Sequence, residues 1–291
     1  MPKPLFLAVG HNGLRFTSPD GKTWSAPVLG KEGATYRCAA GGNGCLAAVG
    51  SYGGSNIFAS TADGVTWKTS IKDAQYARYI RGLGFGNDVF LALGGDPGAV
   101  GQARPFVFTS ADGEKWDGPH DIPGKFMVRR VAFGNKLFVA VGDRGRRAAS
   151  PDGKSWTDAP EVKAIDTLVD VAFGNGVFVG VGLHGLRMLT TDGVKWTDRQ
   201  TGDEGEHLNS VVWAKDRFVA AGAGATYISQ DGLKWERTAN ADAPLTVAYG
   251  NGTFVGPRWK GRLMHSVDGV KWEETHKGDV HIEAVAFIEV K

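Results

Sequence analysis

Pairs of short apolar runs, joined by a two-residue polar turn, recur along the chain. The clearest copies are "VAFGNKLFVAVG" at 131–142 and "VAFGNGVFVGVG" at 171–182, and weaker forms occur before and after them. Asn-Gly between two apolar runs is the strongest short-range signal of a β-hairpin, because both residues tolerate the positive φ angles of a type I′ turn. The runs are apolar throughout and do not alternate with polar residues, which predicts strands buried on both faces.

A second motif, Ser/Thr-x-Asp-Gly-x-x-Trp, occurs seven times, and its first copy is "SPDGKTW" at 18–24. Successive copies are 37 to 49 residues apart, and each of the last six follows one of the hairpins. Only Trp213 and Trp259 lie outside the motif among the nine tryptophans. The aspartates and tryptophans of the motif are Asp20, Trp24, Asp63, Trp67, Asp112, Trp116, Asp152, Trp156, Asp192, Trp196, Asp231, Trp235, Asp268 and Trp272.

Each repeat predicts four antiparallel strands: the two of the hairpin, one that ends at Ser/Thr-x-Asp-Gly, and one that begins at the tryptophan. Four strands at a period of about 40 residues are typical of a propeller blade. The chain opens on a second strand, "PLFLAVG", and closes on a first strand, "EAVAFIEV". We therefore predict an all-β fold, a single seven-bladed β-propeller domain over residues 1–291, closed by pairing of 283–290 with 5–10.

The repeated turn suggests a structural role for both of its signature residues. We expect the aspartate to accept hydrogen bonds from backbone N–H groups of the turn, and the serine or threonine to bridge the turn. The tryptophan would start the outermost strand and cover the gap to a neighbouring blade. The rival interpretation, seven ligand sites with sugar-stacking tryptophans, is disfavoured because the turn lies at the edge of the blade and the ring is needed inside.

The repeated turn resembles the Asp-box of the BNR repeats, Ser-x-Asp-x-Gly-x-Thr-Trp, although it is one residue shorter, as in Ser18 to Trp24. Sialidases, sortilin-type receptors, xyloglucanases and a photosystem II assembly factor carry that box, and bacterial propellers of the type "GNGxFVAVG…SxDGxxW" look most similar. The resemblance implies a folding element without catalysis, so it leaves function open. The chain lacks the early Arg-Ile-Pro segment of sialidases, and we do not expect sialidase activity.

Charge and hydropathy exclude several classes of protein. The chain has 33 basic and 31 acidic residues and a net charge of +2, which argues against a nucleic-acid partner. It has no apolar run long enough to span a membrane, so we expect no membrane partner, and we expect a monomer. The compartment is left open: exported or periplasmic if a signal peptide was trimmed, and otherwise cytoplasmic.

Few residues suggest catalytic or metal chemistry. Cys38 and Cys45 flank the turn at Asn43, about 13 Å apart along the hairpin, too far for a disulfide. His276 and His281 share a loop with Asp279, but their spacing matches no standard zinc motif. There is no phosphate-binding loop, nucleophile elbow or dinucleotide fingerprint. We predict no metal, no cofactor and, as the favoured interpretation, no enzymatic activity.

Basic residues gather in the loops that lead from the second to the third strand of each blade and in the first three loops that lead into a first strand. The last four loops into a first strand are mostly acidic, with "GDEGEH" at 202–207 as the extreme. Both sets of loops share one face around the axis. A solvated rim is the simpler interpretation, and an anion- or protein-binding face is the functional one. Asp170 stands among these positions, and we expect it to form an ion pair with Arg130 of the neighbouring blade. The candidate ligand-binding residues are Arg37, Arg81, Arg129, Arg130, Asp170, His184, Arg258, Trp259 and Arg262.

The function that these features favour is a non-enzymatic binding module that takes a protein or an anionic glycan on the loop face around the central channel. The alternative is a carbohydrate-active enzyme, a glycoside hydrolase or polysaccharide lyase, with a single site at the channel mouth. A multivalent lectin is disfavoured, because it would need the same polar residues in every blade. Loops such as "GSYGGSN" and "GAGAT" share almost nothing except glycine.

Overall fold

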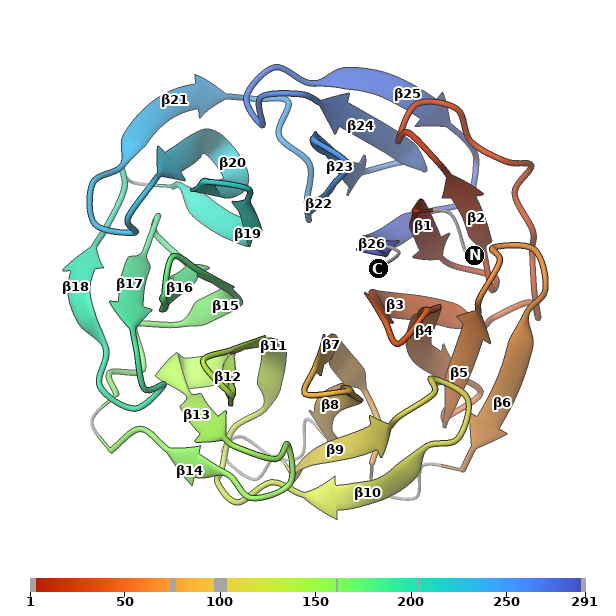
Figure 1. Cartoon of the computed structure of the whole chain (residues 1–291), viewed down its shortest axis with the longest axis horizontal. Helices are drawn as coiled ribbons and strands as arrows, with labels where there is room; N and C mark the ends of the chain where they lie inside the picture. Colours follow the sequence, from red (N-terminus) through yellow and green to blue (C-terminus); the bar gives the residue numbers. More distant parts are fainter. Residues whose placement is uncertain (1–3, 74–76, 97–103, 161, 204, 289–291) are drawn as a thin grey trace.

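A computed structural model describes residues 4–73, 77–96, 104–160, 162–203 and 205–288. Its strands form seven separate antiparallel sheets, arranged as blades around a central axis (Figure 1). The described residues contain a single helical turn, the 3₁₀ segment η1 (Asp143–Gly145), and none of their helices could cross a membrane. The predicted all-β, seven-bladed propeller is therefore confirmed.

The blades are numbered along the chain, and their strands run in order from the axis outward. Blade 1 holds β26 (Ile282–Ile288), β1 (Leu5–Gly10) and β2 (Arg15–Ser18). Blades 2 and 3 hold β3 (Thr35–Gly42), β4 (Cys45–Tyr52), β5 (Ser55–Thr61) and β6 (Lys68–Lys72), then β7 (Ile80–Gly86), β8 (Val89–Asp96), β9 (Arg104–Ser110) and β10 (Asp117–Asp121). Blades 4 and 5 hold β11 (Val128–Gly134), β12 (Leu137–Gly142), β13 (Arg147–Ser150) and β14 (Thr157–Asp158), then β15 (Leu168–Gly174), β16 (Val177–Gly182), β17 (Arg187–Thr190) and β18 (Thr197–Gln200). Blades 6 and 7 hold β19 (His207–Ala214), β20 (Arg217–Ser229) and β21 (Glu236–Asn240), then β22 (Ala248–Gly250), β23 (Thr253–Arg258), β24 (Arg262–Ser266) and β25 (Glu273–Lys277).

Two blades vary the four-strand plan. In blade 1 the outermost position is reduced to a single bridge between Arg15 and Val28. In blade 6, β20 runs through both the second and the third positions, with Gly224 at a φ of 91° where the chain turns. All seven blades nevertheless keep the same path from the axis to the rim.

The ring closes as the split repeat predicts. β1 pairs antiparallel with β26, with Leu5 opposite Ile288 and Leu7 opposite Ala286. Figure 1 shows β26 (blue) beside β1 (red), so the two ends of the sequence share blade 1. The predicted pairing of 283–290 with 5–10 is confirmed for its described part, and residues 289 and 290 lie outside the described residues.

The hairpin prediction is confirmed in its details. Asn43, Asn135 and Asn175 all have positive φ angles, as a type I′ turn requires. Cys38 pairs with Val49, and Cys45 with Gly42, so the two cysteines are offset along the hairpin. Both are free thiols, as their offset predicts.

The hydrophobic core is divided into seven clusters, one at each interface between neighbouring blades. In six blades the second strand contributes a fully buried phenylalanine, such as Phe138 in β12 and Phe178 in β16, and in blade 2 Leu46 takes this position. Burial of each such ring stabilises the fold by roughly 1.5–3 kcal/mol. Seven similar interfaces thus hold seven similar sheets in a closed ring.

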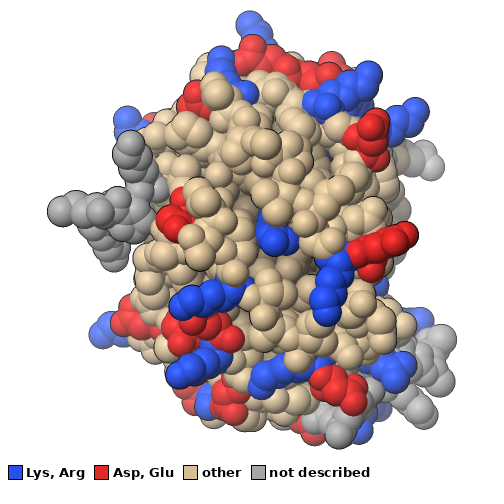
Figure 2. All heavy atoms as spheres, turned by 90° about the vertical axis from the view of Figure 1, so that its right-hand side faces the viewer, with Lys and Arg blue, Asp and Glu red and all other residues tan. Residues whose placement is uncertain are grey.

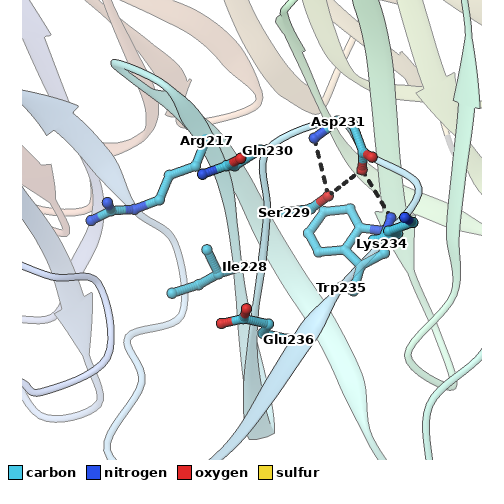
Figure 3. A pocket seen from close by; sticks show the side chains of 8 residues that line it. All are labelled: Arg217, Ile228, Ser229, Gln230, Asp231, Lys234, Trp235 and Glu236. Atoms are coloured by element: carbon cyan, nitrogen blue, oxygen red, sulfur yellow. Dashed lines mark hydrogen bonds between the residues drawn. The ribbon is translucent and has the colours of Figure 1, made fainter.

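The Ser/Thr-x-Asp-Gly turns contain the predicted hydrogen bonds. In blade 6, Asp231 accepts the backbone N–H groups of Leu233 and Lys234, at 2.8 and 2.9 Å, through one carboxylate oxygen. The Ser229 hydroxyl donates to Asp231 (Figure 3), and it also accepts the N–H of Gly232. The same pattern holds in the other six turns.

The motif tryptophans close the gaps between blades, as predicted. Trp116 of blade 3 stacks on Phe58 of blade 2, with ring centroids 4.8 Å apart. Trp156 of blade 4 packs in one cluster with Leu91 and Val107 of blade 3. Its indole N–H donates to Gly153 of its own turn, so the turn and the interface are built together.

Candidate functional site at the channel mouth

The innermost strands share a β-bulge near the point where each enters the channel. In six blades the register skips one residue of the innermost strand, which is left without a partner on the second strand. A bulge of this kind redirects a side chain out of the regular pleat. The skipped residues are Arg37, Arg81, Arg129, Val169, Asn209 and Glu283.

A glycine at the end of the second strand allows the bulge to form. A Cβ atom at Gly142 would overlap the carbonyl oxygen of Met127, and one at Gly182 would overlap that of Thr167. The close approach of this backbone carbonyl therefore explains why glycine ends the "FVAVG" run at these positions. The sequence pattern that predicts the hairpin thus also fixes where the mouth residues stand.

The skipped residues line a cavity of about 230 Å³ at the mouth of the channel. Leu245 and Thr246 supply the seventh blade, and Arg130 completes the wall. A second cavity of about 190 Å³, deeper in the channel, is lined by Cys38, Arg130, Asp170 and the small apolar side chains of the inner strands. Four of the nine candidate residues, Arg37, Arg81, Arg129 and Arg130, therefore share one cavity.

Arg81 is the arginine of this cavity that forms no ion pair with a carboxylate among the described residues, although Glu283 attracts it from a greater distance. Its Nε is buried and makes no hydrogen bond, and its guanidinium carbon lies 5.9 Å from the centre of the Tyr79 ring. Burial, followed by repulsion from Arg37 and Arg129, lowers the pKa of Arg81 below its usual value. An anion placed here would relieve both the desolvation and the repulsion.

The neighbouring arginines are partly neutralised. Arg37 Nη1 lies 3.4 Å from a Glu283 carboxylate oxygen, which is also 2.8 Å from His11 Nε2. Arg129 forms an ion pair with Asp143 in the loop that follows β12. The mouth therefore combines one arginine without an ionic partner with two that are held in place by acids.

Arg130 and Asp170 connect four blades inside the channel. Arg130 Nε lies 3.9 Å from Asp170 Oδ1, which is the expected inter-blade ion pair, and Arg130 also donates to the carbonyl oxygen of Arg81. Asp170 accepts the N–H of Val211 from the next blade at 2.9 Å. Burial raises the pKa of Asp170 despite the opposing effect of Arg130, so this carboxylate depends on its partners to remain charged.

The other candidates lie away from the cavity. Arg258 pairs with Asp242 at 2.6 Å, and Arg262 lies 3.4 Å from Glu274. Trp259 is 64% exposed and stacks on His281, with ring centroids 5.3 Å apart. His184 lies in the loop after β16, where its backbone N–H donates to His207. None of these four residues lines the cavity, although Trp259 contacts His281, two residues before the cavity residue Glu283.

Several loop arginines belong to the scaffold, which the sequence pattern does not reveal. Arg146, Arg147 and Arg187 are each at most 5% exposed. Arg187 lies 4.1 Å above the Tyr227 ring of the next blade, and Arg147 lies 5.2 Å above Trp196. Such cation–π contacts replace part of the lost hydration. Because these arginines are buried, the positively charged surface on the loop face is smaller than the composition of the loops predicts.

The rim of the ring carries mixed charges. On the side that bears β2 and β6, Figure 2 shows Lys and Arg side chains interspersed with Asp and Glu. Ion pairs such as Lys22–Glu273 at 2.6 Å and Lys68–Glu114 at 2.7 Å join neighbouring blades there. This side of the molecule offers no surface of a single sign.

A larger hollow of about 500 Å³ lies beside the repeated turn of blade 6, between Arg217 and Trp235 (Figure 3). Its walls are the turn residues Ser229, Asp231 and Lys234, whose polar groups bond to one another. The same turn recurs in every blade, so we assign this hollow to the scaffold. The channel mouth is the more specific candidate.

Comparison with known proteins supports the fold alone. The chain is similar to the structure "YCF48 bound to D1 peptide", with 15% identity over 94% of this chain and 87% of that chain, and a TM-score of 0.62. It is also similar to virginiamycin B lyase from Staphylococcus aureus (10% identity, 83% of both chains, TM-score 0.64) and to the WD40 β-propeller domain of Doa1 (12% identity, 82% and 81%, TM-score 0.58). No family model and no curated protein matches, so the Asp-box relationship stays a resemblance of the repeated turn.

Proposed function

We propose that this protein is a non-enzymatic binding module that receives an acidic group of a protein partner at the mouth of its central channel. The observation that carries the proposal is Arg81, which is buried at its Nε, has no carboxylate within ion-pair distance among the described residues, and is repelled by two further arginines. A guanidinium group recognises a carboxylate through paired, charge-assisted hydrogen bonds. An aspartate, a glutamate or a C-terminal carboxylate fits this chemistry.

The comparisons are compatible with a protein partner. One propeller of similar fold has been solved with a peptide bound, and another is a WD40 propeller domain. The exposed Trp259, which stacks on His281 just before β26, would supply the kind of aromatic anchor that protein interfaces use. The mouth differs from blade to blade, with arginine, valine, asparagine, leucine and glutamate at equivalent positions, which favours one asymmetric ligand.

The test measures binding of acidic peptides to the wild type and to two arginine variants. We expect Arg81→Ala to weaken binding about tenfold, which corresponds to about 1.4 kcal/mol. Arg258→Ala, which removes an arginine that is paired with Asp242 away from the cavity, should bind like the wild type. Amidation of the peptide C-terminus separates recognition of a terminal carboxylate from that of an acidic side chain.

A second measurement separates a protein ligand from a glycan ligand. Citrate, sulfate and glucuronate are titrated while the melting temperature is followed. A rise in wild type that is lost in Arg81→Ala supports the anion site, and an equal rise in both proteins would falsify it. Preference for glucuronate, or turnover on a polysaccharide array, would favour the glycan or the enzyme alternative over the proposed protein ligand.

A further inference from the structure

Two histidines and a glutamate meet beside the channel mouth, at the seam where the ring closes. His11 follows β1, His281 directly precedes β26, and Glu283 lies in β26. One ligand atom from each residue lies within 4.8 Å of the other two. His11 Nε2 is 2.8 Å from a Glu283 carboxylate oxygen, and the two imidazole rings are 5.1 Å apart in an edge-on arrangement.

From this geometry we propose that His11, His281 and Glu283 form a binding site for a divalent transition metal ion, with Zn²⁺ as the expected occupant. Imidazole and carboxylate ligands suit Zn²⁺, Co²⁺, Ni²⁺ and Cu²⁺, whereas Mg²⁺ and Ca²⁺ prefer oxygen ligands alone. Zn²⁺ binds nitrogen and oxygen at about 2.0–2.2 Å, and three protein ligands plus water complete a common open site. Bonds of this length in a tetrahedral site place ligand atoms about 3.3–3.5 Å apart, so the His11–Glu283 pair at 2.8 Å would open slightly and wider separations, up to 4.8 Å, would close.

The closure of the ring builds this site. The backbone N–H of His11 donates to the carbonyl oxygen of His281 at 3.0 Å, which fixes the two residues side by side. Gly10 permits this approach, because a Cβ atom there would overlap the same carbonyl oxygen. The ligands come from opposite ends of the sequence, so spacing along the chain could not indicate the site. The sequence predicts no metal, and this proposal replaces that prediction.

Neighbouring groups would orient the ligands. Arg37 Nη1 lies 3.4 Å from the Glu283 oxygen that contacts His11, and Trp259 stacks on His281 at an interplanar angle of 17°. Contacts of this kind hold metal ligands in a fixed orientation. When the ion binds His11 through Nε2, it takes the place of the hydrogen bond to Glu283, and the neutral imidazole carries its one proton on Nδ1.

A second histidine pair on the ring provides a matched control. His184 and His207 lie 5.4 Å apart in a similar edge-on arrangement. Among the described residues, only the His11 group combines its histidines with a carboxylate at ligand spacing. The two pairs therefore test whether the complete set of three ligands, rather than histidine exposure, determines binding.

The experiment titrates Zn²⁺ into the full-length, tag-free protein by calorimetry after chelator treatment. We expect one ion per chain at micromolar affinity in the wild type and in His184→Gln, with at least tenfold weaker binding in His11→Gln and Glu283→Gln. Because the ion joins the two ends of the chain, Zn²⁺ at a hundredfold excess over its Kd should also raise the melting temperature by about 4 °C. Circular dichroism verifies that each variant is folded.

A spectroscopic measurement locates the ion independently of stability. Cu²⁺ quenches the fluorescence of a nearby indole, and Trp259 stacks on the ligand His281. We expect Cu²⁺ to quench the wild type, and Trp259→Phe to lose that quenching while it still binds one Zn²⁺. The proposal is overturned if the wild type binds no Zn²⁺ in the micromolar range, or if His11→Gln and Glu283→Gln bind it as the wild type does.

Discussion

At the scale of single residues, the repeated turn uses one carboxylate to order two backbone N–H groups. In Asp231 the N–H groups of Lys234 and Leu233 hold the pKa of the carboxyl below its usual value. Around Asp152, partial burial acts in the opposite direction, but the hydrogen bonds from Ser155 and Lys154 prevail and lower the pKa to about 2. Because the pKa of every motif aspartate is lowered, the seven turns respond to acid together.

Acid should therefore unfold the protein through these turns. A carboxyl whose pKa is lower in the folded state adds stability above its unfolded pKa of about 3.9, and this stability is lost as pH falls towards the folded value. We expect the urea midpoint to fall steeply between about pH 4 and pH 2.

The matched variants are Asp152→Asn and Asp279→Asn. Asp152→Asn should lower the urea midpoint at neutral pH. It should also reduce by about one the number of protons taken up during acid unfolding, because the asparagine side chain does not titrate in this range. Asp279 is exposed and lies outside the motif, so Asp279→Asn should follow the wild type. Identical acid profiles for all three proteins would contradict this account.

The arginines show where prediction from sequence ends at this scale. The hydropathy of Arg147 and Arg187 places them on the surface, and nothing near them in the sequence shows the aromatic ring that covers each one. Those rings belong to the next blade. Likewise, Arg81 and Arg129 look alike in the sequence, but only the folded ring shows that Asp143 pairs with Arg129.

At the scale of elements, the blades and their order follow from two short patterns, because each is a local property of the chain. The Asn-Gly hairpin predicts the two inner strands, and the Asp-Gly turn and its tryptophan mark the two outer ones. The bulge in the inner strands and the continuous path of β20 depend instead on how a strand is packed against its neighbours. The repeat pattern of the sequence therefore cannot predict the bulge or the continuous β20.

The tryptophans provide a test at this scale. Trp156 is 9% exposed and packs between blades 3 and 4, whereas Trp259 is 64% exposed on a loop. Trp156→Ala should lower the free energy of unfolding by about 3–5 kcal/mol, because it removes a large ring from a closed interface. Chemical denaturation measures the change, and Trp259→Ala should stay close to the wild type. A larger loss in Trp259→Ala would show that the division into scaffold and loop is mistaken.

At the scale of the whole molecule, the ring brings together residues that no local pattern connects. The channel mouth takes one residue from the same bulge position in six blades, and the proposed metal site joins His11 to Glu283 across the seam. The sequence reveals that the ring closes, since its first and last segments are complementary halves of one blade. The side chains that closure brings into contact can be read only from the fold.

The last prediction concerns the seam itself. β26 buries Ile282, Val285 and Ile288 against the neighbouring strands, so a chain that ends at residue 279 loses the inner strand of blade 1 and exposes the edge of β1. This truncated chain should melt at a clearly lower temperature than the full chain and should self-associate. A synthetic peptide of residues 280–291 should bind it and restore the melting temperature, because the peptide supplies the missing strand, whereas a peptide of the same composition in scrambled order should not. A truncated chain that stays monomeric and melts at the original temperature would show that the seam does not hold the ring closed.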